Sequence, residues 1–145
     1  MTAITEPRDT PMRDCILIPV PVAKGEAIPM GAIVCINATG FAVNGKADAT
    51  LKYAGCADES VDNSAGDDGA QLINVRANKA FKWASDGTIT QASLLSRAYI
   101  LDNQTLTATD GSAPASEDGK TEAVAASSPS AGKIILIESD GVWIY

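Results

Sequence analysis

The sequence contains no histidine, and this absence excludes several kinds of chemistry at once. Without an imidazole the chain has no histidine general base, no serine–histidine or cysteine–histidine nucleophile and no histidine-ligated metal. Its three cysteines, Cys15, Cys35 and Cys56, are too widely spaced for a C-x-x-C zinc or redox motif. No other set of nucleophile, base and oxyanion donors can be recognised. We therefore expect a protein that is not an enzyme and has no catalytic residue, cofactor or metal site.

Basic residues are few. Lys and Arg number 11 against 18 Asp and Glu, which gives a net charge of -7 and a pI near 4.4. Nucleic-acid binding draws much of its affinity from Lys and Arg side chains that neutralise phosphates. An acidic chain without a basic run is therefore not expected to bind nucleic acid.

Long apolar runs are also lacking. The most apolar stretch, residues 15–23, is interrupted by Pro19 and Pro21, whereas a membrane-spanning helix needs about 20 apolar residues. No signal or anchor segment is recognisable. We expect a chain that is made in the cytoplasm and has no membrane partner.

Helical patterns are nearly absent, and residues 90–97 are the only stretch expected to form one or two helical turns. Short β-branched or aromatic runs separated by Gly, Asn, Asp and Ser clusters predict strands instead. In one of them Leu72, Asn74 and Arg76 alternate with apolar residues, which indicates a half-buried strand. The fold class expected is all-β, a small β-sandwich or barrel-like domain. The predicted strands are residues 16–22, 32–36, 41–43, 50–57, 71–77, 80–84, 98–101, 104–109, 133–138 and 142–145.

Two segments lack strand patterns and divide the chain. Residues 1–15 carry two prolines and mixed charges without periodicity, which predicts an extended N-terminal arm. A single β-domain is expected over residues 16–145. Within it, residues 110–132 hold no large apolar residue except Val124 and predict one long surface loop, functional or mobile.

The acidic stretch, residues 58–69 ("DESVDNSAGDDG"), invites comparison with a calcium loop. A loop of the EF-hand type needs glycine at its sixth position, flanking helices and glutamate at its twelfth. Counting from Asp58 places Asn63 at the sixth position, and counting from Asp62 places Asp67 there. Because neither register fits, we favour a solvated connection between two strands.

Other candidate sites have structural explanations. "GKT" at residues 119–121 lacks the upstream glycine, strand and helix of a phosphate-binding loop. Cys35 and Cys56 fall in strand patterns and are expected to be small buried hydrophobic residues. The odd cysteine count leaves Cys15 as a possible inter-chain thiol. The aromatic residues Trp83, Trp143 and Tyr145 are expected to pack in the core or at edges and not to form a ligand platform.

Four segments in order, "RDTPMRD", "GCADESVDNSAGDDGAQLINVRANKAFKWASDG", "AYILDNQTLTAT" and "AGKIILIESDGVWIY", resemble the capsid decoration proteins of tailed bacteriophages, also called structural cement proteins. The likeness spans residues 8–145 and lies in the order and spacing of the segments. It implies a non-catalytic virion protein that binds the outer surface of the phage head and stabilises contacts between major capsid protein subunits. It also implies synthesis in a bacterial host.

The partner expected from this resemblance is the phage major capsid protein, with self-association into a homo-oligomer, a trimer favoured and a dimer possible. In the arm, Ile4, Arg8, Met12 and Arg13 are the residues expected to anchor on the capsid, because they combine apolar and cationic side chains in a segment too polar to fold alone. Two alternatives stay open. One is another virion component, a tail or head-fibre module, and the other is a carbohydrate-binding β-sandwich.

Overall fold

The computed structural model describes residues 3–145, and in this part of the chain the fold is built almost entirely from β-strands. The only helical element among these residues is a single 3-10 turn, η1 (Gln91–Ser93), which lies within the stretch expected to form helical turns. No helix of the described chain has the length and apolar character needed to cross a membrane. The strands are β1 (Leu17–Pro21), β2 (Ala27–Ile28), β3 (Ile33–Ile36), β4 (Ala42–Asn44), β5 (Lys52–Ala57), β6 (Val61–Asp62), β7 (Leu72–Arg76), β8 (Phe81–Ser85), β9 (Arg97–Ile100), β10 (Thr105–Thr107), β11 (Ser130–Glu138) and β12 (Gly141–Ile144).

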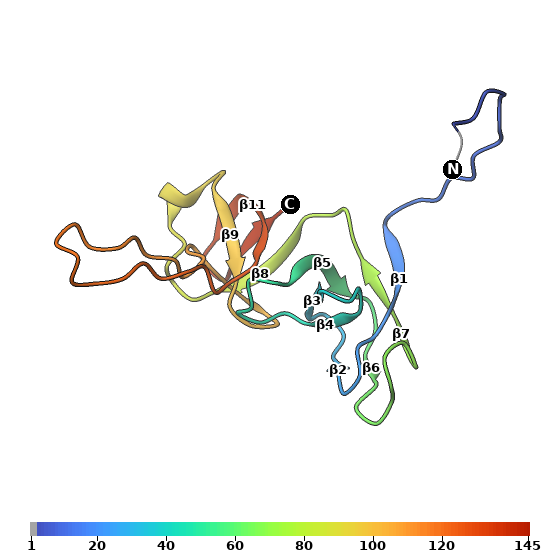
Figure 1. Ribbon diagram of the computed structural model, residues 1–145, viewed down its shortest axis with the longest axis horizontal. Helices are drawn as coiled ribbons and strands as arrows, with labels where there is room; N and C mark the ends of the chain where they lie inside the picture. The colour runs from blue at the N-terminus through green and yellow to red at the C-terminus, as the bar shows by residue number, and fades with distance from the viewer. Residues whose placement is uncertain (1–2) are drawn as a thin grey trace.

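The strands form two main bodies that lie side by side (Figure 1). The first is a five-stranded antiparallel sheet in the order β1-β7-β5-β3-β4. The second is a small closed barrel in the order β10-β8-β12-β11-β9, in which only the β10–β8 pair is parallel. The short pair β2–β6 forms a separate two-stranded sheet.

The sheet and the barrel share one hydrophobic core. Alternate residues of β3 point to opposite faces of the sheet, so Ile33 and Cys35 face the barrel. There they join Trp83 and other buried side chains of β8, β9, β10, β11 and β12. Burial of this apolar surface is the dominant force that holds the two bodies together.

A second core covers the opposite face of the sheet. Val34 of β3 and Ile73 and Val75 of β7 pack there with Ile28 of β2. Because β3 is covered on both faces, its sequence is a continuous apolar run without polar alternation. In β7, by contrast, the burial alternates as the sequence pattern predicts, with Ile73 and Val75 buried and the flanking residues partly or fully exposed.

The all-β prediction is confirmed, and each of the ten predicted strand segments overlaps a strand. The architecture is an open sheet beside a closed five-stranded barrel, so the barrel-like alternative describes it in part and the sandwich does not. The sequence reasoning missed the two shortest strands, β2 and β6. It also placed residues 130–132 in the long loop, whereas they begin β11. Gly132 permits this, because a side chain there would crowd the Tyr145 main chain, which pairs with Lys133.

Several connections are closed by Asx turns, in which a side-chain oxygen accepts a hydrogen bond from the main-chain N–H two residues further on. The sequence signal is Asn or Asp followed after one residue by Ser or Thr. Such turns explain why short polar segments suffice between the strands. They occur at Asn37–Thr39, Asp48–Thr50, Asp62–Ser64, Asp86–Thr88 and Asp110–Ser112.

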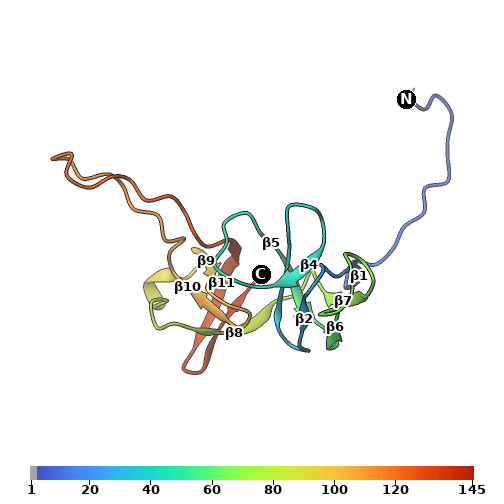
Figure 2. The ribbon, with the colours of Figure 1, turned by 60° about the horizontal axis from the view of Figure 1, so that its bottom comes forward.

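Two segments project from opposite ends of the molecule in both views (Figures 1 and 2). Residues 3–14 contain no strand, are exposed throughout and lead away from β1. Between β10 and β11 the long loop, residues 108–129, doubles back on itself as a hairpin with one bridge, between Ala113 and Val124. Both segments therefore offer surface that their own domain does not cover.

Candidate interaction surface

The N-terminal segment makes almost no contact with the rest of the described chain. Met12 is 99% exposed and Ile4 is 69% exposed. The side-chain hydrogen bonds found here are local, from Arg8 Nε to Thr10 and from Cys15 Sγ to the Arg13 carbonyl. The four predicted anchor residues therefore lie along an exposed chain, and the structure does not gather them into a pocket.

The sheet begins to hold the chain at Cys15. Asn78 Nδ2 donates a hydrogen bond to the Cys15 carbonyl at 2.8 Å, and Ala77 N donates to the Ile16 carbonyl at 2.8 Å. The Cys15 thiol itself is exposed and unpaired. Cys15 thus lies where the exposed segment joins β1, and its role as an inter-chain thiol stays a prediction.

Strand β1 forms one edge of the five-stranded sheet, and its outward side is blocked by prolines. Hydrogen bonds at Ile16–Ala77 and Val22–Gln71 show that the even-numbered residues of β1 direct their main chain toward β7. The outward positions are therefore Leu17, Pro19 and Pro21, and proline has no N–H to donate. Only Leu17 offers an outward donor, which disfavours the addition of another strand at this edge.

The side chains of this edge are more available for binding than its main chain. Ile16, Leu17 and Ile18 are all exposed although they are large and apolar. Leu72, opposite Pro21 on β7, is exposed to 60%. We call these four exposed apolar side chains at the sheet edge the β1 edge surface, and three of them follow the N-terminal segment directly in sequence. Sequence reasoning treated residues 16–22 only as a strand, and the signal it missed was the absence of polar alternation in a strand that has just one neighbour.

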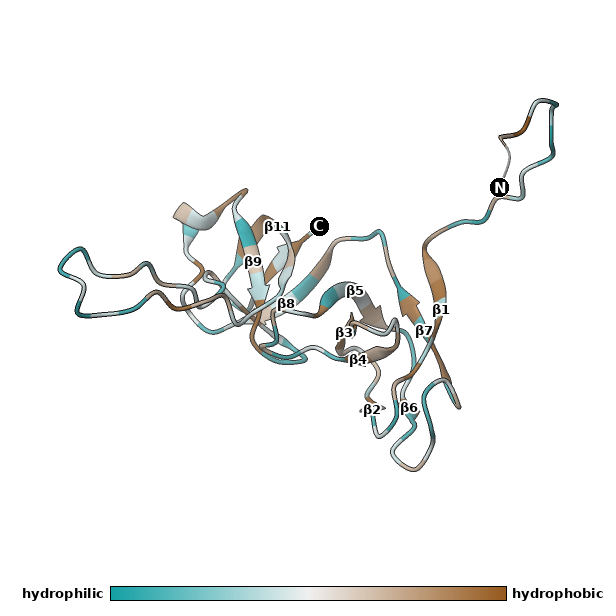
Figure 3. Ribbon diagram, viewed as in Figure 1, coloured by the Kyte–Doolittle hydropathy of each residue, from teal (hydrophilic) through white to brown (hydrophobic). Residues whose placement is uncertain are grey.

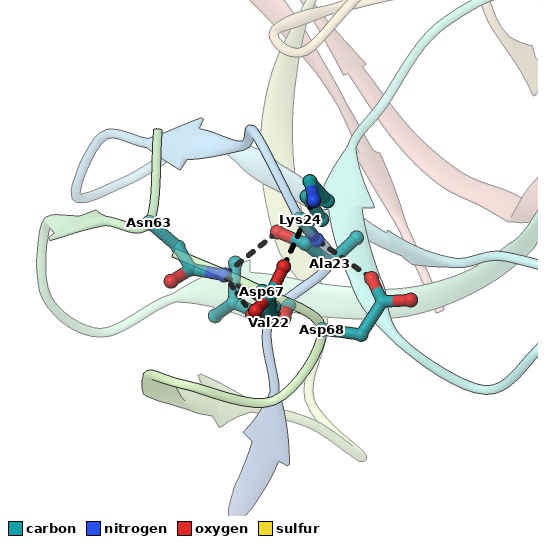
Figure 4. Close-up of polar contacts among 6 residues, drawn as sticks. All are labelled: Val22, Ala23, Lys24, Asn63, Asp67 and Asp68. Atoms are coloured by element: carbon teal, nitrogen blue, oxygen red, sulfur yellow. Dashed lines mark hydrogen bonds and ion pairs between the residues drawn. The ribbon is translucent and has the colours of Figure 1, made fainter. Parts of the chain in front are cut away.

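The acidic stretch is organised around Asn63, which is only 2% exposed (Figure 4). Its Nδ2 donates to the carbonyl oxygens of Ala23 and Asp67, both at 3.0 Å, and more weakly to that of Val22 at 3.3 Å. Its main-chain N donates to the Glu26 carbonyl at 2.8 Å. Asn63 therefore fastens the acidic stretch to the connection between β1 and β2.

The carboxylates of the acidic stretch point to separate donors. Asp58 pairs with Arg76 at 2.9 Å, and Asp67 pairs with Lys24 Nζ at 2.8 Å. The Asp68 carboxylate accepts a hydrogen bond from the Lys24 main-chain N at 2.7 Å (Figure 4). Within residues 3–145 there is no group of three or more acidic or cysteine side chains arranged to hold a metal ion. The geometry supports the interpretation as a structural connection, although this connection contains β6 and a buried asparagine that the sequence pattern did not reveal.

The remaining candidate residues are mostly in the cores. Cys35 and Cys56 are buried, as expected, and burial raises the pKa of Cys35 to about 12 and that of Cys56 above its ordinary value. Trp83 is buried and packs against Phe81 with ring centroids 6.0 Å apart. Tyr53 is also in the shared core, where burial raises its pKa to about 12. These side chains therefore lie within or against the shared hydrophobic core.

The remaining tryptophan, Trp143, makes polar contacts on the barrel wall. Trp143 Nε1 donates to Glu138 at 3.0 Å, and the same carboxylate pairs with Lys82 at 2.7 Å. Tyr145 is exposed and does not pack in the way the sequence suggested. Trp143 is thus held on the barrel wall by Glu138, while the Tyr145 side chain is exposed.

Comparisons with protein-family models, curated proteins and solved structures found no match to this chain.

Proposed function

We propose that this chain is a non-catalytic structural protein of a tailed bacteriophage, one that decorates the outer surface of the head and stabilises contacts between major capsid protein subunits. The observation that carries the proposal is the N-terminal segment, which presents Ile4 and Met12 to solvent without a partner in its own domain. The segment order that resembles capsid decoration proteins supports the same function.

The N-terminal segment suits the role of an arm that docks on a neighbouring subunit. Its prolines, Pro7 and Pro11, restrict the main chain, so less conformational entropy is lost when the segment becomes ordered on a partner. Arg8 and Arg13 form no ion pair among the described residues and are free to meet carboxylates of that partner. Apolar side chains with cationic neighbours are typical of binding anchors.

The β1 edge surface extends this contact area into the folded domain. Its apolar side chains follow the arm directly in sequence, so a capsid subunit that binds the arm also meets the sheet. Because the prolines of β1 leave few outward donors, the contact relies on side-chain burial more than on added strands. Self-association of the domain around a local symmetry axis completes the proposed decoration of the shell.

Cosedimentation with expanded, undecorated heads of the phage that encodes the chain tests the proposal. Full-length protein should pellet with the heads, and deletion of residues 2–14 should leave the β-domain folded but speed its dissociation. Decorated heads should also rupture at a higher temperature than bare heads, because a ligand that binds only the assembled shell stabilises it.

Point variants test whether binding depends on the apolar side chains of the arm or only on the presence of the segment. Ile4→Ser with Met12→Ser removes the apolar anchors, and Thr5→Ser with Thr10→Ser serves as the matched control that keeps them. If only the variant with Ile4→Ser and Met12→Ser is retained less well on heads, the result supports binding through the arm. Equal retention of the deletion and the full chain would show that the arm does not bind, and failure of both to bind heads would refute decoration itself.

A further inference from the structure

Leu95 adopts a backbone conformation that leucine rarely takes. Its φ is 66°, in the left-handed region where a Cβ crowds the following carbonyl group and where glycine or asparagine is usual. The side chain gains little burial from its own domain in return, because it is 66% exposed. A strained position that holds a large exposed apolar residue is a reason to look for a binding role.

A second irregularity lies beside it in β11. The pairing of β11 with β12 slips between Ile134 and Leu136, so Ile135 is the extra residue of a β-bulge. Ile134 is buried, but both Ile135 and Leu136 are exposed, whereas regular alternation would turn one of them inward. Bulges commonly re-aim side chains in this way near functional surfaces.

These two irregularities meet on one wall of the barrel. Leu95 N donates to the Ile134 carbonyl at 2.9 Å, and Ile134 N donates to the Ser96 carbonyl at 2.9 Å. In Figure 3 the ribbon is coloured as hydrophobic at the turn before β9 and along part of the neighbouring β11. We call this surface the barrel-wall patch, and its exposed apolar residues are Leu94, Leu95, Ile135 and Leu136.

The patch also has an unusual charge arrangement. Arg97 of β9 and Lys133 of β11 are directly opposite in register, and both are exposed. Like charges placed opposite each other destabilise a strand pair. Among the described residues neither side chain has a carboxylate within ion-pairing distance, and Arg97 bonds only to the Ser130 hydroxyl at 3.1 Å. The patch is therefore suited to a partner that supplies carboxylates around an apolar contact.

The long loop of the same chain has this complementary character. It carries four acidic residues and one lysine, and its tip is held as a hairpin by the Ser116–Thr121 hydrogen bonds. Glu117 and Glu122 are exposed, and neither forms an ion pair among residues 3–145. Val124 of the loop is 54% exposed. In Figures 1 and 2 the loop leads away from the barrel and does not fold back over its own wall.

We propose that the barrel-wall patch of one copy binds the long loop of a second copy, with Arg97 and Lys133 facing Glu117 and Glu122. The contact is heterologous, because a symmetric patch-to-patch dimer would oppose the two basic pairs to themselves. This inference rests on the self-association included in the proposed function and names the surfaces that perform it. Its test uses purified protein alone, so its failure is distinguishable from a failure to bind heads.

Sedimentation equilibrium of the purified full chain should show reversible self-association that weakens as salt is added, since the contact pairs opposite charges. Leu95→Gly should weaken it by about tenfold or more, as truncation of a central apolar contact does. The same substitution relieves the left-handed strain, so the melting temperature should stay unchanged or rise. Leu101→Ser removes another exposed leucine away from the patch and should leave association unaltered.

Mixing two charge variants tests whether the patch of one copy binds the loop of another. Arg97→Glu with Lys133→Glu disables the patch, and Glu117→Lys with Glu122→Lys disables the loop, so neither variant should associate alone. Mixed together they should bind each other, because the reversed charges are again complementary. A full chain that is monomeric at all concentrations, a Leu95→Gly variant that associates as the wild type does, or a mixture that stays monomeric would each overturn the proposal.

Discussion

Asn63 permits a sharp test of how the acidic stretch is held. Replacement by alanine removes two hydrogen bonds of 3.0 Å and one of 3.3 Å from a side chain that is almost fully buried. The Val22 carbonyl keeps the Gly69 N–H and the Asp67 carbonyl keeps the Ala70 N–H, so the acceptors are not left bare. At about 1 kcal/mol for each good hydrogen bond, with a smaller packing loss, Asn63→Ala should lower the free energy of unfolding by about 2–3 kcal/mol.

Asn63→Asp should be worse than Asn63→Ala at neutral pH, although aspartate is closer in shape. It replaces an amide donor by a buried carboxylate that faces carbonyl oxygens, and such an uncompensated charge costs about 3–5 kcal/mol. As the pH falls the carboxyl group gains a proton and can donate again. The difference between the two variants should therefore shrink in acid.

Urea unfolding of both variants at neutral and acid pH measures these differences. Asn37 provides the matched control, because its Oδ1 accepts hydrogen bonds from Thr39 and Phe41 and an aspartate can replace it as an acceptor. Asn37→Asp should change the free energy of unfolding by no more than about 0.5 kcal/mol. Equal stability of Asn63→Asp and Asn63→Ala at neutral pH would refute the donor role of Asn63.

Three further results are expected. Hydrogen bonds from Lys82 lower the pKa of Glu138 and of Asp140 below their ordinary values of 4.5 and 3.8, so this stabilisation is complete above about pH 5 and is lost as the pH falls through the lowered values. Lys82→Met should therefore flatten the acid limb of a plot of melting temperature against pH, and an unchanged slope would contradict the assignment. Chelators of divalent ions should leave the melting temperature unchanged, whereas a fall of several degrees would revive a calcium site. A thiol reagent should label Cys15 in the native protein but reach Cys35 only on unfolding, because burial raises the pKa of Cys35 to about 12, and equal labelling rates would refute this.

The strands were largely predictable because their signals are local. Runs rich in β-branched residues between turn-forming clusters mark β3 and β7, and alternation in β7 even predicts which residues are buried. Turn chemistry also depends on residues two apart, as in Asp86–Thr88. Such features need only neighbouring residues, so one sequence contains them.

Features that depend on distant partners were not predictable. Strand β6 has only two residues and exists because Ala27 and Ile28, far away in sequence, pair with it. The burial of Asn63 likewise depends on carbonyl groups about 40 residues away. A buried asparagine in a run of turn-forming residues has the same sequence signature as an exposed one.

Of the two candidate binding surfaces, the sequence indicates one and does not indicate the other. The polarity and prolines of the N-terminal segment predict an exposed arm, and the residues proposed to anchor it were chosen from the sequence. The barrel-wall patch cannot, because it arises from the left-handed backbone at Leu95 and from a bulge in β11, neither of which has a sequence signature here. Leucine at a left-handed position is the opposite of what propensity suggests, so only the folded backbone reveals it.

The edges of the five-stranded sheet affect how these surfaces can bind. A closed barrel has no edge, and the five-stranded sheet has two, at β1 and at β4. Prolines occupy two of the three outward positions of β1. The outer side of β4 is covered by the chain that follows β1, where Ala23 N donates to the Ala42 carbonyl and Glu26 accepts from Asn44 N at 3.0 Å. In the proposed function many copies are displayed on one shell at high local concentration, where open edges would pair without selectivity. With these two edges covered or poor in outward donors, association of the sheet is expected to use side chains, loops and the N-terminal segment.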